Sequence, residues 1–273
     1  MFKKSTLAAA GLMLGLSTMA ATPAQAHRAW LLPSMTVLAG DDETVSVDAA
    51  ISNELFVFEH HAMPLDDLVI TGPDGTQVEP AIIGSGRYRS VFDVPLKEQG
   101  TYRIAIARNG MMGFYELNGE RKRWRGSKDD LPGAIPDGAT NVRLMETASR
   151  TETFATLGAP TDTALQPSGV GLEMIPVTHP NDLVATEAAT MRFVLDGEPV
   201  EGMDVEFVEG GTRYRDNAGI QTLTTDANGE VSLMAPEAGM YFIEASQGSR
   251  RGEQTDGPAR RASYTAVLEF MPL

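Results

Sequence analysis

The chain has 273 residues, of which 22 are basic and 37 acidic, and its formal net charge is −15. This acidity argues against nucleic acid as a partner, because the phosphates of nucleic acid would be repelled. Cysteine is absent, so disulfides, thiol chemistry and cysteine-based metal sites are excluded. A chain of this length can bury its own core without cross-links.

Residues 1–26 have the features of a secretory signal peptide. Two lysines form a charged start, an apolar run follows, and Ala24-Gln25-Ala26 has the A-x-A pattern of a cleavage site. The apolar run is too short to cross a bilayer, and no later stretch approaches the roughly 18 uninterrupted apolar residues of a spanning helix. We expect an exported, periplasmic protein whose mature chain begins at His27 and has no membrane span. An uncleaved N-terminal anchor is the alternative.

A chain that begins at His27 would place a free α-amino group beside an imidazole. The amine nitrogen and Nδ1 can close a chelate ring around one metal ion, because both can lose a proton near neutral pH when a metal competes for it. One or two further imidazoles would complete a nitrogen-rich site suited to Cu(II), Ni(II) or Zn(II). The segment FEHHAM offers the remaining candidate ligands: Glu59, His60, His61 and Met63.

The geometry of this segment decides how many of its side chains join the chelate. On a strand, His60 and His61 would point to opposite faces, so only one of them would meet His27. The Met63-Pro64 pair indicates that a strand ends nearby, in which case both histidines could converge. Glu59 could ligate directly or accept a ring N–H. The alternative is that the histidine pair is an ordinary solvated surface feature.

Short alternating runs bounded by Gly, Pro, Asp and Asn recur along the chain, whereas helical periodicity is scarce. The first half is predicted to hold strands at 44–52, 68–75, 88–95 and 101–107. The second half is predicted to hold strands at 191–200, 203–210, 229–236, 240–246 and 262–270. We expect an all-β chain of two immunoglobulin-like antiparallel β-sandwich lobes, at 27–160 and 171–273, with a linker within 157–171.

The two predicted lobes share one sequence pattern, found at 91–107 and 231–245. Each copy has a strand, a proline, a Gly-x-Tyr step and an alternating strand. Gly100 and Gly239 permit a sharp turn into the second strand. Tyr102 and Tyr241 are predicted to bury their rings while their hydroxyls return to the backbone, as at the corner of a sandwich. A chance match of one hairpin is the alternative.

The segment 118–138 interrupts the strand pattern with a basic loop. It surrounds Trp124 with five cations in an otherwise acidic chain: Arg121, Lys122, Arg123, Arg125 and Lys128. One interpretation is a docking loop for an anionic partner, with Trp124 as an exposed anchor. The other is a solvated hairpin whose arginine stems cover the tryptophan ring.

Four segments together resemble a known family: 26–34, 171–182, 195–208 and 224–245. They include an exported histidine followed by an aromatic residue, a Gly-Leu-x-x-x-x-Pro segment and a TDANGEV hairpin. The chain resembles the periplasmic domain of unknown function 4198 family, often labelled NikM-like and associated with nickel or cobalt uptake. The resemblance implies a two-lobe β-sandwich that handles divalent transition metals, with His27 where mature members begin. Arg28 stands where many relatives carry an acidic residue, so the neighbouring ligands are expected to differ.

Three functions are open at this point. The first is a soluble periplasmic accessory protein that binds Ni(II), Co(II) or Cu(II) through His27 with His60 or His61, and serves a membrane transporter or an outer-membrane receptor. The second is a non-catalytic adhesion or scaffolding module whose basic loop binds a protein or a polyanion. The third is a copper-dependent oxidative enzyme. We expect no enzyme, since the common catalytic motifs and an aromatic substrate-binding face are missing from the sequence.

Overall fold

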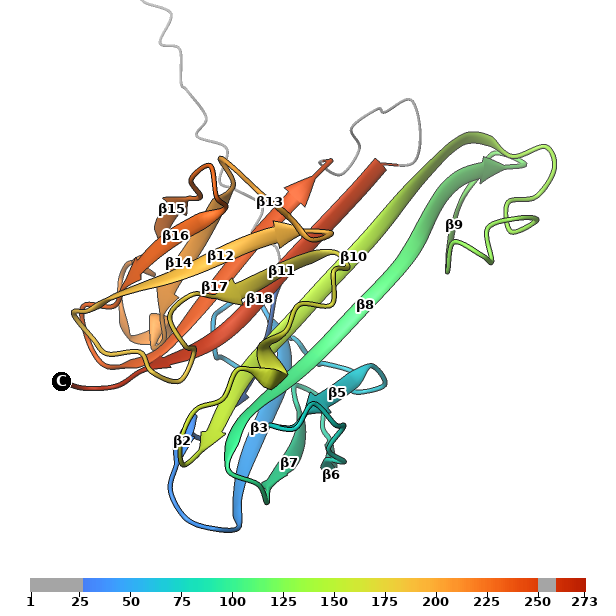
Figure 1. Cartoon of the computed structure of the whole chain (residues 1–273). Coiled ribbons are helices and arrows are strands. Elements are labelled where there is room, and N and C mark those ends of the chain that lie inside the picture. Colours follow the sequence, from blue (N-terminus) through green and yellow to red (C-terminus); the bar gives the residue numbers. More distant parts are fainter. Residues whose placement is uncertain (1–26, 250–258) are drawn as a thin grey trace, which may run out of the picture.

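The structure is a computed structural model that describes residues 27–249 and 259–273. The expected signal peptide, residues 1–26, lies outside the described residues. Nearly all regular structure is β-strand (Figure 1), and the two helical turns are η1 (Thr163–Leu165) and η2 (Thr212–Tyr214). Within the described residues, no helix has the length and apolar character needed to cross a bilayer.

The strands form three sheets. The first sheet has the order β1 (Arg28–Pro33), β3 (Glu43–Ser52), β7 (Ser90–Leu96) and β6 (Ala81–Ser85), with β4 (His61–Ala62) paired to β3. The central sheet has the order β15 (Gln221–Thr224), β14 (Asp204–Glu209), β17 (Gly239–Gly248), β18 (Ala259–Phe270), β10 (Thr140–Leu157), β8 (Gly100–Leu117) and β5 (Leu68–Thr71), with β2 (Val37–Leu38) on β10 and β9 (Glu120–Gly126) on β8. The third sheet has the order β11 (Leu172–Pro176), β12 (Ala188–Leu195) and β13 (Glu198–Pro199), with β16 (Glu230–Met234) on β12.

The central sheet is covered on both faces, because alternate side chains of its strands enter different cores. On β10, Phe154 belongs to the core beneath the third sheet, whereas Ala155 and Leu157 belong to the core beneath the first sheet. On β18, Leu268 enters the former core and Val267 points to the opposite face. The prediction of an all-β protein with immunoglobulin-like sandwich lobes is therefore confirmed.

The two sandwiches are joined through their shared sheet and not only by the chain between them. Strand β10 lies in the first predicted range and β18 in the second, yet they pair in parallel from Met145↔Ala259 to Thr153↔Val267. A third apolar cluster lies where the lobes meet, and it consists of Trp30, Ala50, Leu55, Val208, Phe242 and Val267. Trp30 is fully buried there, so β1 is packed against both lobes.

The two predicted tyrosine corners are present. The Tyr102 hydroxyl donates to the Glu98 carbonyl oxygen at 3.0 Å, and the Tyr241 hydroxyl donates to the Glu237 carbonyl oxygen at 2.8 Å. Both tyrosines are buried. The repeated Gly-x-Tyr step thus builds the same corner at the start of β8 and at the start of β17.

A largely buried ionic network connects β10 to β18 and to β11. The Tyr264 hydroxyl donates to Oε1 of Glu152 at 2.7 Å, and Arg150 lies 3.5 Å from Oε2 of Glu152 and 3.2 Å from Oε1 of Glu173. The backbone N–H and the hydroxyl of Ser168 also donate to Glu173, both at 2.9 Å. Burial raises the pKa of Tyr264 well above its usual value, so this hydroxyl remains a donor.

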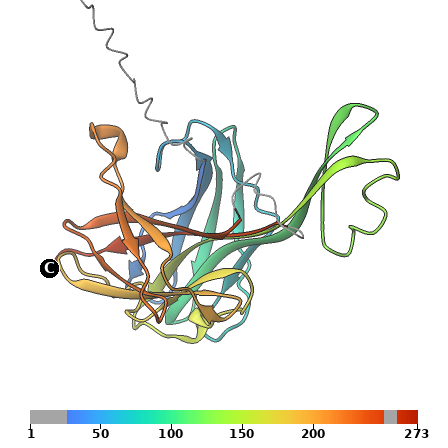
Figure 2. The ribbon, with the colours of Figure 1, turned by 90° about the horizontal axis from the view of Figure 1, so that it is seen from above.

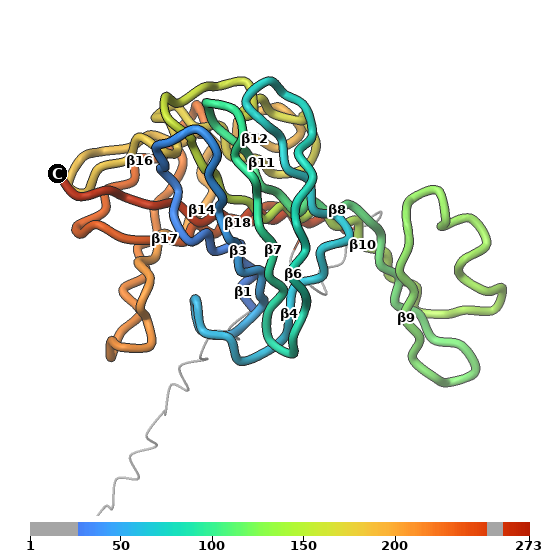
Figure 3. The backbone as a smooth tube through the Cα atoms, turned by 90° about the horizontal axis from the view of Figure 1, so that it is seen from below, coloured from blue at the N-terminus to red at the C-terminus, as the bar shows by residue number. Residues whose placement is uncertain are grey.

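Of the two interpretations of the segment 118–138, a docking loop or a solvated hairpin, the structure shows a hairpin, in which β9 pairs with β8. Strand β8 was expected to end at residue 107 but continues to Leu117, where β9 folds back along it. The outer halves of β8 and β10, together with β9, project beyond the two sandwiches (Figures 1 and 2). Figure 3 shows the same projection from below, with the segment 118–138 well apart from the remaining chain.

Candidate functional site

The structure brings three of the four histidines of the chain into one exposed row. The ring centroid of His27 lies 4.0 Å from that of His60, and the ring centroid of His60 lies 4.6 Å from that of His61. All three residues are solvent-exposed. We call these residues the histidine row. The fourth histidine, His179, lies in the segment after β11, where its Nε2 is 3.0 Å from the Thr101 hydroxyl.

In the histidine row, His27 and His60 lie face to face, and the ring of His61 is tilted by 38° from that of His60. His27 and His60 are stacked with an interplanar angle of 20°. Imidazole lone pairs lie in the plane of the ring, so stacked rings do not direct their nitrogens at one ion. In agreement, no group of three or more His, Asp or Glu side chains within 27–249 and 259–273 forms an assembled metal site. Binding of a metal would therefore require these exposed rings to rotate.

Two neighbours fix the position of His27. Its Nδ1 lies 2.7 Å from Oδ1 of Asn53, so a protonated Nδ1 donates a hydrogen bond there. The next residue, Arg28, is 7% exposed and its guanidinium pairs with Glu206 and Glu244 on the neighbouring lobe. The predicted chelate uses the same Nδ1, which must leave Asn53 before it can hold a metal. Neither Asn53 nor the partners of Arg28 stood out in the sequence, because they lie far from His27 along the chain.

Proximity of the rings changes the titration of the middle histidine. Desolvation lowers the pKa of His60 below its usual value, and the neighbouring charges of His27 and His61 lower it further. The charge of Glu59 acts in the opposite direction. A neutral imidazole is the form that ligates a metal, so the lowered pKa favours the ligating form of His60.

Glu59 and Met63 have other roles in this structure. The carboxylate of Glu59 accepts the backbone N–H groups of Asn53 and Glu54 at 3.1 and 3.3 Å. Desolvation acts to raise the pKa of Glu59, but these hydrogen bonds outweigh it and the pKa is lowered. Met63 is 1% exposed and packs in the core beneath the first sheet. Its thioether is thus enclosed away from the exposed histidine row and leaves the predicted ligand set.

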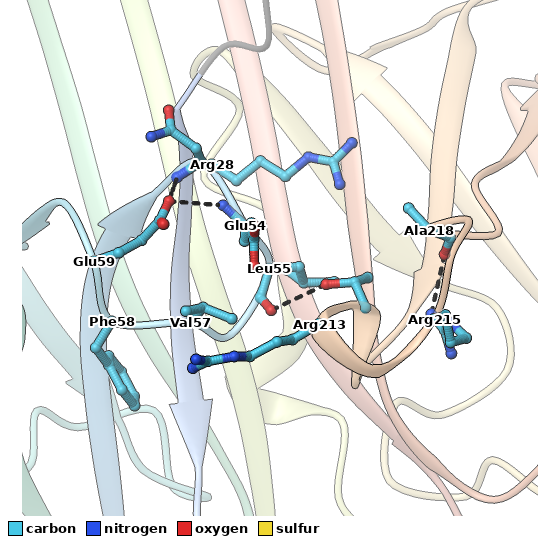
Figure 4. Close-up of a pocket in the computed structure, with 11 residues that line it drawn as sticks. Arg28, Glu54, Leu55, Val57, Phe58, Glu59, Arg213, Arg215 and Ala218 are labelled. Carbon is cyan, nitrogen blue, oxygen red and sulfur yellow. Dashed lines mark hydrogen bonds between the residues drawn. The ribbon is translucent and has the colours of Figure 1, made fainter.

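A cavity of about 550 Å³ opens beside the histidine row, between the two lobes. One wall is the segment 53–59 of the first lobe, and the other is the β14–β15 connection, with Arg213 and Arg215 (Figure 4). The walls touch where the Thr212 hydroxyl donates to the Leu55 carbonyl oxygen at 3.4 Å. Cavities at the junction of two lobes are a common location for ligand sites.

The charges of this cavity are mostly compensated within the protein. Arg28 is paired as described, and Arg215 pairs with Glu209 at 2.7 Å and donates to the Ala218 carbonyl oxygen at 3.0 Å. Among the described residues, Arg213 has no ion pair within 4.0 Å, and its guanidinium extends beneath Val57 (Figure 4). The cavity therefore presents mixed charge, and two of its lining residues, Arg28 and Glu59, are the sequence neighbours of His27 and His60.

Fold and site define a two-lobe immunoglobulin-like β-sandwich protein with an exposed histidine row where the lobes meet. The chain belongs to the family described as Domain of unknown function (DUF4198), whose family model matches residues 24–248. That description assigns no activity, so the nickel and cobalt association implied by the resemblance stays a prediction. No curated protein matches the sequence.

Solved structures of low similarity include domains of Intimin and of a mouse nectin-like molecule. The D0-D1 domain of Intimin is 12% identical, with 88% of this chain and 97% of that chain covered at a TM-score of 0.21. The full Ig1–Ig3 ectodomain of mouse nectin-like molecule 4 is 9% identical, with 89% of this chain and 63% of that chain covered at a TM-score of 0.21. Scores this low carry no argument about function.

Proposed function

We propose that the chain is a soluble periplasmic accessory protein that captures a divalent transition metal, Ni(II), Co(II) or Cu(II), at the histidine row. The observation that supports this proposal is the row of three imidazoles, in which the centroid distance is 4.0 Å from His27 to His60 and 4.6 Å from His60 to His61. His60 and His61 lie 33 and 34 positions after His27 in the sequence. Their rings meet on the surface, so burial in a core does not account for their meeting. Imidazoles are suitable ligands for all three metals.

The proposed site assembles on binding. The exposed rings of His27, His60 and His61 rotate out of their stack so that their nitrogens converge on the ion. If export removes residues 1–26, the new α-amino group of His27 adds a further nitrogen, and Nδ1 exchanges Asn53 for the metal. The metal is the cargo in this proposal, and release to a membrane transporter or an outer-membrane receptor follows from reversible binding.

The proposal is tested by isothermal titration of each metal into protein that begins at His27. His27→Ala and His60→Ala are expected to weaken binding at least about tenfold, since each removes a ligand. His179→Gln is the matched control, because it removes an imidazole outside the histidine row and should leave affinity within about twofold. Unchanged affinity in both row variants would refute the proposal.

A second comparison isolates the α-amino group. Protein with one alanine added before His27 keeps every imidazole but moves the amine away from Nδ1. Weaker binding by this extended protein supports the chelate, as two donors on one residue close a ring around the ion. Equal binding, together with loss in His60→Ala, would assign the metal to the imidazoles alone and reject the chelate.

A further inference from the structure

Strand β9 forms a free edge of the central sheet. It pairs with β8 from Leu117↔Glu120 to Met111↔Gly126, and it has no second partner among the described strands. The loop that follows lies over one face only, where Ile135 and Trp124 both approach Gly113. The outer edge of β9 therefore keeps its backbone hydrogen-bonding groups available.

The turn before β9 determines which backbone groups point outward. Strands β8 and β9 are joined by Asn118-Gly119, with φ of 55° and 78°, as in a type I′ hairpin. In such a hairpin the residues that flank the turn exchange hydrogen bonds, and the following pairs alternate. Lys122 and Trp124 therefore bond to β8, so the N–H and C=O groups of the intervening residues point to the free edge. Those residues are Arg121, Arg123 and Arg125.

The same three residues present their side chains together. Residues two apart on a strand share a face, and all three arginines are exposed. The Arg121 side chain is 92% exposed and reaches only one carboxylate, that of Glu116, at 3.9 Å. Among the described residues, Arg123 and Arg125 have no ion pair within 4.0 Å. We call the three residues the arginine edge.

We propose that the arginine edge docks an acidic, extended segment of a partner protein, which adds to the central sheet as a strand beside β9. Main-chain hydrogen bonds to residues 121, 123 and 125 would supply affinity, as in other cases of strand addition. Residues directly opposite one another in paired strands lie on the same face. Acidic residues at alternate positions of the partner would therefore face the three arginines.

Charge also argues against a second copy of this chain as the occupant. Pairing β9 with β9 of another copy would place arginines close to arginines, and like charges opposite one another are destabilising. A flexible polyanion would satisfy the charges but not the row of outward backbone groups. The acidic strand satisfies both sets of groups. This inference is independent of the histidine row, whose residues lie before β1 and at the start of β4.

The probe for the test is a synthetic peptide of about eight residues in which glutamate alternates with threonine. The chain has two tryptophans, and Trp30 is buried with 0% exposure, so Trp124 on β9 serves as the fluorescent reporter of binding. Substituting all three arginines of the arginine edge by glutamine is expected to weaken binding about tenfold or more. The control variant Lys97→Gln, Lys122→Gln, Lys128→Gln removes the same charge from positions outside this face, since Lys97 lies in the β7–β8 connection at the far end of β8, and a loss below about threefold is expected.

Peptide variants separate strand addition from general charge attraction. A peptide with glutamine in place of glutamate should lose binding, and so should a peptide N-methylated along one edge, because N-methylation removes the backbone donors. Equal binding by the N-methylated peptide would overturn the proposal, as would equal losses in the two triple variants. If inorganic polyphosphate displaces the peptide and N-methylation does not change peptide binding, the arginine edge is a general polyanion site and the proposal is wrong. Far-ultraviolet circular dichroism checks that both variants remain folded.

Discussion

At the scale of single residues, Arg28 is the residue that ties the histidine row to the second lobe. Its guanidinium lies between Glu206 and Glu244 and is 5.6 Å from the centre of the Phe242 ring. A cation with two carboxylate partners is strongly held when it is mostly removed from water. His27 immediately precedes this anchor, so its backbone is held next to His60 while its exposed ring can still rotate.

Glu244 predicts a dependence of stability on pH. Burial raises the pKa of Glu244 above its ordinary value of 4.5, although the charge of Arg28 acts against this. Between pH 4.5 and the raised folded-state pKa, the folded protein holds a proton that the unfolded chain releases. The free energy of unfolding therefore falls as pH rises through this window. Glu244→Gln removes this titration. As pH rises through the window, the free energy of unfolding of the variant should therefore increase relative to that of the unmodified protein.

Urea unfolding at a series of pH values measures this difference. The test depends on how the difference in free energy of unfolding between the two proteins changes with pH. Its sign at a single pH is not informative, because the variant also weakens the pair with Arg28. A difference between the two proteins that stays constant from about pH 4 to about pH 8 would contradict the prediction.

Tyr241 offers a second prediction at this scale. Tyr241→Phe keeps the buried ring but removes the hydroxyl that donates to Glu237 at 2.8 Å. We expect a loss of about 1 kcal/mol in the free energy of unfolding, since the Glu237 carbonyl loses its donor. Tyr88→Phe is the control, because Tyr88 is 38% exposed. Chemical denaturation that finds equal stabilities for the two variants would count against the tyrosine corner.

At the scale of elements, the repeated pattern of β8 and β17 permits a matched comparison of two glycines. Gly100 and Gly239 have φ of +130° and +153°, which side chains adopt only with strain. A Cβ at Gly100 would lie 2.5 Å from Cβ of Pro73 and 2.8 Å from Oγ1 of Thr161, whereas nothing lies within 4 Å at Gly239.

Gly100→Ala is therefore expected to destabilise the protein more than Gly239→Ala. The strained backbone costs about 1–3 kcal/mol in either variant, and the clash adds about 1 kcal/mol or more at Gly100. Thermal and urea unfolding of both variants measure the order. Greater destabilisation by Gly239→Ala than by Gly100→Ala would contradict the difference in packing around the two glycines.

Strands with a clear alternation of apolar residues were predictable, and the corners followed from one Gly-x-Tyr step. Strand β10 was not, although it is 18 residues long. Its inward positions include Arg150 and Glu152, which are buried because they pair with each other and with Glu173 and Tyr264. Hydrophobic periodicity cannot identify a strand whose buried face is partly ionic. The meeting of His27 with His60 was foreseen as a possibility, but the stacking and the bond to Asn53 depend on side-chain geometry that no spacing encodes.

At the scale of the whole molecule, the shared central sheet makes the two sandwiches one structural unit. Strand β10 contributes Phe154 to one core and Leu157 to the other. The apolar cluster around Trp30 packs at the junction of the lobes, on the face of the central sheet opposite to the core beneath the third sheet. We therefore expect damage in the junction to affect both lobes at once.

Trp30→Ala tests this coupling. Trp30 is 0% exposed, and removal of a buried tryptophan side chain is expected to cost about 3–5 kcal/mol. Circular dichroism should report one unfolding transition in the variant, at lower urea than in the unmodified protein, and calorimetry should give equal calorimetric and van't Hoff enthalpies. Tyr214→Ala is the surface control, because Tyr214 is 87% exposed. Two separate transitions would show that the lobes unfold independently.

The position of β18 has a consequence for biosynthesis. This strand comes last along the chain, at Ala259–Phe270, yet it lies in the interior of the central sheet between β17 and β10. While a ribosome is still making the chain, the inner edges of β17 and β10 have no partner to cover them. The sheet cannot close until β18 is available, and the pairing of β10 with β18 joins residues that are distant in sequence, a kind of contact that forms slowly. Until β18 is in place, those two edges are open to pairing with strands of other chains.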